Sequence, residues 1–183
     1  CEPYFGSGSV FFAEKQKYEK YILNDKDEDI VNFLRVLISQ DGEELISRLT
    51  CLEPEEWEFK RAKGYERENY RYCSALERAV FTYIIISQSF NNTRKSFRRG
   101  MDAKVYQKRI ARGLPLAQQR LREANVEIHN TDALEIIRQY EYFRHIGAHD
   151  AKNDLIRQAY AEFPFDFRIV TKYAVCLLSN GDI

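Results

Sequence analysis

Two glycines and two carboxylates are the residues of this chain whose types and spacing could do chemistry. The turn Gly6-Ser7-Gly8 follows a short segment, and Asp25 ends the apolar run Tyr21-Ile22-Leu23, 17 residues after the second glycine. Asp132 follows another short run, Val126-Glu127-Ile128. Glycines let a backbone turn tightly and approach a ligand, and a carboxylate after the next strand can accept hydrogen bonds from ribose hydroxyls. Together they predict a nucleoside-cofactor crevice at the carboxyl ends of a sheet; the alternative is a set of structural turns.

Other chemistries fit these residues less well. No GK[ST] follows Gly8, so the turn is not the phosphate loop of a nucleotide hydrolase. Phe11 stands where a dinucleotide-binding GxGxxG has its last glycine, which argues against a nicotinamide cofactor. His145 and His149 are spaced to share a helix face as metal ligands, but no third ligand accompanies them, so we expect no metal site.

Charge is distributed unevenly, although the 28 basic and 28 acidic side chains cancel. From Arg94 to Arg122, ten basic residues stand against Asp102 alone. Such a block repels itself unless something anionic neutralises it, and a phosphate backbone is the ordinary candidate. The alternative is a solvated helix face. The residues that we expect to contact DNA are Arg94, Lys95, Arg98, Arg99, Lys104, Lys108, Arg109 and Arg112.

Short strands that alternate with helices must position these residues, and that order indicates an α/β fold with a parallel sheet. The sheet is expected to be incomplete, because its first strand is cut short at Cys1. Gly64 is expected to break the stretch around Trp57. The expected helices are Ile30–Ile38 with Asp29 as its cap, Gly42–Leu49, Ser74–Ser89, Leu114–Ala124 with Pro115 in its first turn, and Leu134–Tyr140.

Two helical patterns without a strand between them, Asp150–Phe163 and Asp166–Leu178, follow the α/β region. We therefore divide the chain into a domain of residues 1–140 and a helical tail of residues 141–183. The length of 183 residues suits one domain with a short appendage. The longest apolar run, Val80 to Ile86, is too short to span a membrane. Four separated cysteines and the absence of a signal peptide predict a cytoplasmic protein without membrane partners.

Four segments resemble the D12-class, Dam-like family of DNA adenine N6-methyltransferases. Residues 2–12, EPYFGSGSVFF, are similar to the cofactor motif of that family, and residues 22–33 are similar to its next segment. Residues 77–91 also resemble the family, although Asn92 stands where a glycine is usual. Residues 126–133 resemble the strand and acid that precede the catalytic strand. The four segments occur in family order over roughly residues 1–140.

The resemblance implies S-adenosylmethionine as cofactor and duplex DNA as partner, in an enzyme of restriction-modification or Dam type. The target adenine would be rotated out of the base stack. A Rossmann-like sheet would carry a helical DNA-recognition insertion at about residues 50–113. Asp25 would bind the ribose and Asp132 would lie near the adenine ring of the cofactor. The implied cofactor-binding residues are Tyr4, Phe5, Gly6, Ser7, Gly8, Asp25 and Asp132.

The chain departs from the family at the catalytic motif. The family has [DNS]PP[YFW] after the strand that follows Asp132, but no two of the four prolines here are adjacent. We therefore assign no catalytic residue and expect a truncated or inactive form. The tail weakly resembles a tetratricopeptide-like helix pair, which would allow a protein partner. The alternatives are a non-catalytic DNA-binding remnant and a helical protein-interaction module.

Overall fold

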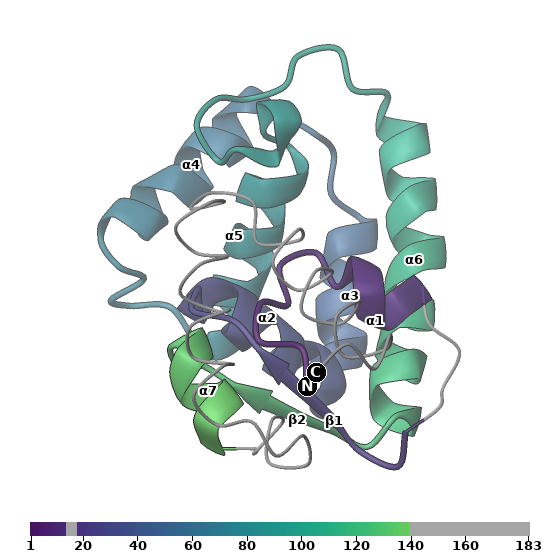
Figure 1. The fold of residues 1–183 in the computed structure, drawn as a ribbon. Helices are drawn as coiled ribbons and strands as arrows, with labels where there is room; N and C mark the ends of the chain where they lie inside the picture. Colours follow the sequence, from purple (N-terminus) through teal and green to yellow (C-terminus); the bar gives the residue numbers. More distant parts are fainter. Residues whose placement is uncertain (14–17, 140–183) are drawn as a thin grey trace.

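The computed structural model describes residues 1–13 and 18–139. Helices make up most of this part, and a small parallel sheet lies at its lower end in Figure 1, beside α2. The tail of residues 141–183, with His145 and His149, lies outside the described residues. The elements in chain order are α1 (Ser9–Ala13), β1 (Tyr21–Asn24), α2 (Glu28–Ile38), α3 (Gly42–Thr50), α4 (Glu56–Arg67), α5 (Ala75–Ser87), the 3-10 turn η1 (Phe90–Asn92), α6 (Ala103–Glu123), β2 (Val126–His129) and α7 (Ala133–Gln139).

The sheet places three chain segments side by side in the same direction. β1 pairs in parallel with β2, from Tyr21 opposite Val126 to Asn24 opposite His129. On the other side of β1, Glu2 forms a parallel bridge to Leu23, with the Glu2 N–H donating to the Ile22 carbonyl at 2.7 Å. This arrangement is consistent with an incomplete α/β methyltransferase fold, because the carboxyl ends of all three segments meet at one edge.

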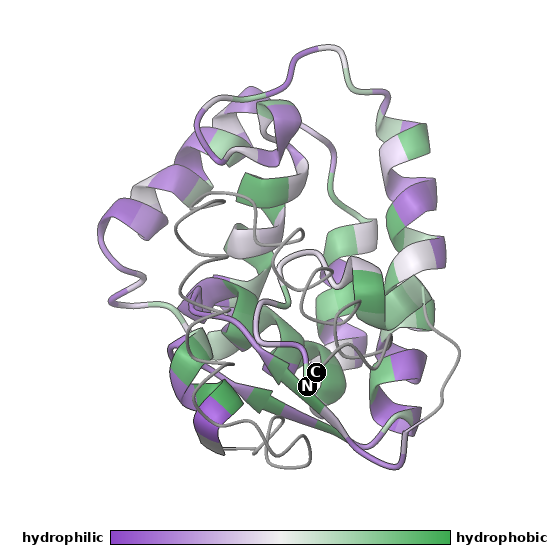
Figure 2. Cartoon of the chain, in the orientation of Figure 1, coloured by the Kyte–Doolittle hydropathy of each residue, from purple (hydrophilic) through white to green (hydrophobic). Residues whose placement is uncertain are grey.

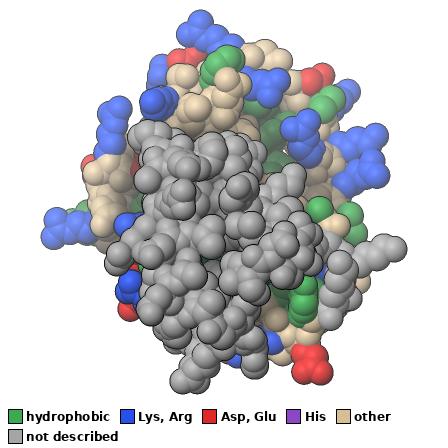
Figure 3. All heavy atoms as spheres, in the orientation of Figure 1, with side chains coloured by type: hydrophobic (Ala, Val, Ile, Leu, Met, Phe, Trp, Pro, Cys, Tyr) green, Lys and Arg blue, Asp and Glu red, His purple; other side chains and the backbone are tan. Residues whose placement is uncertain are grey.

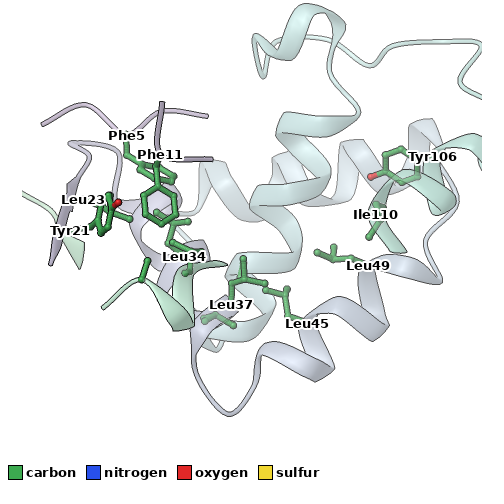
Figure 4. Close-up of a cluster of buried hydrophobic side chains, with 14 residues drawn as sticks. Phe5, Phe11, Tyr21, Leu23, Leu34, Leu37, Leu45, Leu49, Tyr106 and Ile110 are labelled. Carbon is green, nitrogen blue, oxygen red and sulfur yellow. The ribbon is translucent and has the colours of Figure 1, made fainter. Parts of the chain in front are cut away.

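The core lies where α2, α3, α5 and α6 pack together beside the sheet (Figure 4). In α2, the buried residues Val31, Leu34 and Leu37 recur every three positions and form one face. Figure 2 shows hydrophobic ribbon in β1 and α5, and a mostly hydrophilic ribbon along α4. α4 packs chiefly on α5, at the margin of the molecule. The expected helical insertion of residues 50–113 contains α4, α5, η1 and the first half of α6.

The predicted start of α5 is confirmed by a complete capping box. The Ser74 hydroxyl accepts from the Glu77 N–H at 3.2 Å, and the Glu77 carboxylate accepts from the Ser74 N–H at 2.9 Å.

The predicted cap of α2 was wrong by two residues. Asp27 caps that helix by accepting from the Asp29 N–H at 3.0 Å, and the Asp29 side chain pairs with Arg78 instead.

α6 corrects the expectation of a separate helix that begins near Pro115. It is a single helix of 21 residues with Pro115 inside it. A proline inside a helix lacks one N–H donor and costs about 3 kcal/mol, so packing must offset the loss. Ile110 and Leu121, on either side of the proline, are both 1% exposed. α4 likewise continues through Gly64, where a break was expected.

Candidate functional site

Asn24 joins the ends of the three parallel segments. Its side chain is 1% exposed, and its Nδ2 donates to the carbonyls of Pro3 at 2.9 Å and of Thr131 at 3.0 Å. Its Oδ1 accepts from the Thr131 N–H at 3.0 Å and from the Thr131 hydroxyl at 3.2 Å. Both amide donors and the acceptor are therefore used, so the edge that carries the glycine turn and both predicted carboxylates is held together. Asn24 was not among the predicted site residues, and its only signal in the sequence was an amide at the end of an apolar strand.

The glycine turn is fixed to this edge by main-chain hydrogen bonds. The Phe5 N–H donates to the Asn24 carbonyl and the Gly8 N–H donates to the Phe5 carbonyl, both at 2.7 Å. Gly6 and Gly8 have φ values of +51° and +68°, which favour glycine. A Cβ on Gly8 would lie 2.5 Å from the Phe5 ring, whereas a Cβ on Gly6 would meet nothing within 4 Å. The lack of a side chain at Gly8 therefore lets the Phe5 ring pack closely against the turn, whereas the main chain at Gly6 is open to a ligand.

The Asp25 carboxylate contacts the glycine turn directly. Its Oδ2 accepts from the Gly6 N–H at 2.7 Å, and its Oδ1 accepts from the Asp27 N–H at 2.9 Å. The side chain is only partly buried. A carboxylate offers about four lone-pair positions, so both oxygens retain acceptor capacity after these two bonds. The structure thus brings together the predicted acid and the predicted glycine turn, in a carboxylate of fixed orientation.

Asp132 lies at the same edge, since it follows Thr131, but its contacts differ from those of Asp25. Its Oδ1 accepts from the Leu134 N–H at 3.0 Å, at the start of α7. Its Oδ2 lies 3.6 Å from the Lys26 Nζ, and both side chains are largely exposed. Asp132 therefore caps a helix with one oxygen and leaves the other near solvent.

The remaining predicted cofactor residues divide between the core and the surface. Phe5 is 5% exposed, and its ring packs against Phe11 and Phe12, so it shapes the turn through its main chain. Tyr4 is half-buried beside it. Ser7 is exposed, and its hydroxyl lies 2.6 Å from the Ser9 hydroxyl.

An ion-pair network begins two residues after Asp25. The Arg78 guanidinium lies 2.8 Å from the Glu28 carboxylate and 2.7 Å from the Asp29 carboxylate. Arg94 lies 2.5 Å from Asp27 and 3.7 Å from Asp29. The hydrogen bond from Arg78 lowers the pKa of the Glu28 carboxyl. Arg94, which was expected to contact DNA, therefore connects the loop after η1 to the first turn of α2.

The other predicted DNA contacts lie at the surface. Lys104, Lys108 and Arg112 are exposed and recur every four residues along α6, away from its buried residues Tyr106 and Ile110. Figure 3 shows lysine and arginine side chains along the margin that α6 and the loop before it occupy in Figure 1. We call this surface the basic face; its members are Lys95, Arg98, Arg99, Lys104, Lys108, Arg109 and Arg112. Arg99 lies 3.5 Å from Glu56, at 84% side-chain exposure.

Within residues 1–13 and 18–139, no group of three or more histidine, cysteine or carboxylate side chains is arranged to hold a metal ion. No helix in that part of the chain is both long enough and apolar enough to cross a bilayer.

The parallel edge, its glycine turn and its strand-terminal acid are features of α/β enzymes that bind a nucleoside cofactor. Comparison with known families gives a more specific result. Residues 1–156 match the model of the D12 class N6 adenine-specific DNA methyltransferases. The chain therefore belongs to that family, which methylates adenine in DNA. No curated protein matches the chain.

We predict that Asn24→Leu destabilises the protein by about 3 kcal/mol. The substitution keeps the side-chain size but removes the partner of part-buried polar groups of Pro3 and Thr131, and a group left unsatisfied costs about 1–3 kcal/mol when it is buried. Asn130→Ala is the control, because Asn130 is exposed and, among the described residues, its side chain makes a single hydrogen bond, from Nδ2 to the Asp25 carbonyl at 2.8 Å. Urea unfolding followed by circular dichroism measures both. Equal losses in the two variants would contradict the role of Asn24.

Proposed function

We propose that this chain binds S-adenosylmethionine at the glycine crevice and duplex DNA at the basic face, as parts of a DNA adenine N6-methyltransferase. The family match over residues 1–156 supports the reaction class. The observation that carries the cofactor assignment is the hydrogen bond from the Gly6 N–H to the Asp25 carboxylate, because it holds an acid against the turn that would receive the cofactor.

The residues present fit such a cofactor. Asp25 is oriented by two main-chain donors, and each oxygen retains a lone pair for a ribose hydroxyl. Gly6 has open space where a side chain would stand, which allows close approach to its main chain. Tyr4, Ser7 and Gly8 complete the turn. The cofactor, when bound, supplies an electrophilic methyl group for transfer to the adenine amine.

We assign Asp132 to the adenine end of the cofactor. Its Oδ1 is held by the Leu134 N–H, which fixes the carboxylate at the start of α7. Among the described residues its Oδ2 pairs with the exposed Lys26, at 3.6 Å, and an exposed ion pair of this kind contributes little. That oxygen is available to accept from an exocyclic amine. Asp25 and Asp132 would then mark the two ends of the nucleoside, on neighbouring strand ends.

The basic face supports DNA binding through phosphates. Lys104, Lys108 and Arg112 form one row along α6, so their charges can follow a phosphate backbone. We assign Arg94 a different role, because its guanidinium is paired with Asp27 and Asp29. It holds the loop that carries Lys95 and Arg98, and we expect it to contribute to DNA binding through that loop.

We predict that Asp25→Ala weakens binding of S-adenosylhomocysteine about tenfold or more. Hydrogen bonds to charged groups contribute about 1.5–3 kcal/mol, and 1.4 kcal/mol is a factor of ten in Kd. Asp41→Ala is the control, because Asp41 is exposed at the start of α3 and makes no side-chain capping bond. Isothermal titration calorimetry measures both variants. Unchanged binding by Asp25→Ala would show that the ribose role is wrongly assigned.

We predict that Lys104→Ala combined with Lys108→Ala weakens binding to every duplex sequence and flattens its salt dependence. Each lost phosphate contact reduces the slope of log affinity against log salt by about 0.9, so the double variant should lose about 1.8. The control combines Lys20→Ala with Arg48→Ala, because these cations pair with Glu127 and Glu44 outside the basic face. Fluorescence anisotropy over a salt series gives the slopes. Equal slopes for wild type and the Lys104 and Lys108 variant would identify the basic face as a solvated helix face.

We predict that the 183-residue chain alone does not methylate DNA. Transfer to an exocyclic amine needs oriented groups that hold the amine and stabilise its developing charge, and the family uses [DNS]PP[YFW] for this purpose. No such tetrapeptide occurs in the sequence. Loss of one oriented group typically costs about 10² to 10³ in rate. Incubation with adenine-containing duplex and tritiated cofactor should leave the DNA unlabelled, and labelling above a no-protein control would refute the prediction.

A further inference from the structure

Two hydrogen bonds and an ion pair lead from the glycine crevice to the loop of residues 89–98. The Gly6 N–H donates to Oδ2 of Asp25 at 2.7 Å. Oδ1 of the same carboxylate accepts from the Asp27 N–H at 2.9 Å, and Oδ2 of Asp27 lies 2.5 Å from the Arg94 guanidinium. Each step is a direct contact, so the proposed cofactor site is joined without a gap to a loop that carries part of the basic face.

The ion pair between Asp27 and Arg94 is oriented at its acidic end. Oδ1 of Asp27 caps α2 by accepting from the Asp29 N–H at 3.0 Å, which leaves Oδ2 to face the guanidinium. The Asp27 and Arg94 side chains are 32% and 24% exposed. Salt and solvent screen a partly buried pair less than a fully exposed one. The pair therefore holds the loop to the residues that orient Asp25.

The loop is closed on itself by main-chain contacts. Ser89 and Phe97 form an antiparallel bridge, and the Phe90 N–H donates to the Ser96 carbonyl at 2.8 Å. Because its two ends are joined, the loop is expected to move as one unit. The side chain of Arg94, between those ends, thus sets the placement of the whole loop.

The backbone of this loop depends on its surroundings. Asn91, Asn92 and Arg94 have φ values of +51°, +56° and +61°. Asparagine tolerates this region through its short polar side chain, whereas the long side chain of arginine gains nothing comparable. Such conformations persist only where neighbouring contacts hold them. At Arg94 these are a bond from its N–H to the Ser89 hydroxyl at 3.0 Å and the ion pair with Asp27, so loss of the ion pair favours a second loop arrangement.

We propose that Asp27 and Arg94 are positioning residues that couple the two proposed binding sites, so that a bound cofactor tightens the binding of DNA. A ribose bonded to Asp25 immobilises that carboxylate, and with it the Asp27 N–H and the ion pair. DNA phosphates that contact Lys95 favour the same loop arrangement. Two ligands that favour one arrangement raise the affinity for each other by the same factor. This inference rests on the proposed function.

The sign of the coupling distinguishes this mechanism from two others. S-adenosylhomocysteine carries no net charge, so a simple attraction between ligand and phosphates would not tighten DNA binding. If DNA phosphates instead drew Arg94 away from Asp27, the ligand and DNA would weaken each other. Positive coupling with an uncharged ligand is therefore specific to a loop that is held in place by the ion pair.

The first test measures duplex binding with and without saturating S-adenosylhomocysteine. Fluorescence anisotropy of a fluorescein-labelled duplex should show that the full chain binds about fivefold more tightly in its presence, at the low end of typical coupling factors. Calorimetry should show the same factor for S-adenosylhomocysteine when duplex is saturating, because coupling is reciprocal. Equal or weaker duplex binding in the presence of S-adenosylhomocysteine would overturn the proposal.

Two variants remove the ion pair from its opposite ends. Asp27→Asn keeps an oxygen that can cap α2, and Arg94→Gln keeps a polar side chain. Each should reduce the coupling factor to about one, and the double variant should reduce it no further. Arg122→Gln is the control and should keep the fivefold factor, because Arg122 pairs with Glu43 at 3.0 Å, outside the loop. With circular dichroism unchanged, coupling that survives either single variant, or that is also lost in the control, would contradict the assigned role.

Hydrogen exchange adds a readout that a purely structural ion pair would not move. S-adenosylhomocysteine should slow amide exchange in residues 89–98 of the wild-type chain, although these residues lie outside the glycine crevice. The same addition should leave their exchange unchanged in Asp27→Asn. Exchange in the loop that does not respond to S-adenosylhomocysteine in the wild-type chain would also refute the coupling.

The wild-type results separate this inference from the proposed function. Binding of both ligands with a coupling factor of one would overturn the coupling and leave both proposed sites intact. Failure to bind S-adenosylhomocysteine or duplex DNA would overturn the proposed function, and the coupling with it.

Discussion

The amide of Asn24 is the contact on which the candidate cofactor site depends. β1 and β2 have only four residues each, and so short a parallel pair has few ladder hydrogen bonds to fix its ends. Asn24 compensates by bonding to Pro3 on one side and to Thr131 on the other, while nearly excluded from solvent. Because buried amide groups are costly to leave unpaired, these bonds favour a single relative placement of the three ends. That placement in turn sets the relative positions of the glycine turn, Asp25 and Asp132.

Arginine residues in this molecule serve two physical roles. Arg78 and Arg94 pair with the acids at the start of α2, and Arg122 binds the Glu43 carboxylate and the Ser39 carbonyl. Arg98 and Arg109 are exposed and lack ion pairs within the described residues. The first group stabilises the packing of helices and loops, and the second leaves positive charge for a ligand. A count of basic residues therefore overstates the charge that is available to DNA.

The contacts of Arg94 also connect the two proposed binding regions. Its loop leads to Arg98, on the basic face, and its guanidinium contacts Asp27, two residues after the proposed ribose acid. The stretch between β1 and α2 thus supports the proposed cofactor crevice through Asp25 and the loop that carries Lys95 and Arg98 through Asp27. In a DNA adenine N6-methyltransferase a methyl group passes from the cofactor to a base, so the two proposed binding regions would have to lie close together.

The sequence by itself determined the features that depend on neighbours along the chain. The glycine turn, the short strands of β1 and β2 and the capping box of Ser74 follow from local spacing, and the structure contains each of them. Only the tertiary structure decided which distant groups meet. One partner of Asn24, Thr131, is 107 residues away, and Arg94 turns inward to α2. α6 continues through Pro115 because its buried face is packed on both sides of the proline. Local propensity cannot encode these outcomes, because burial and ion pairing are properties of surfaces that exist only after the chain has folded.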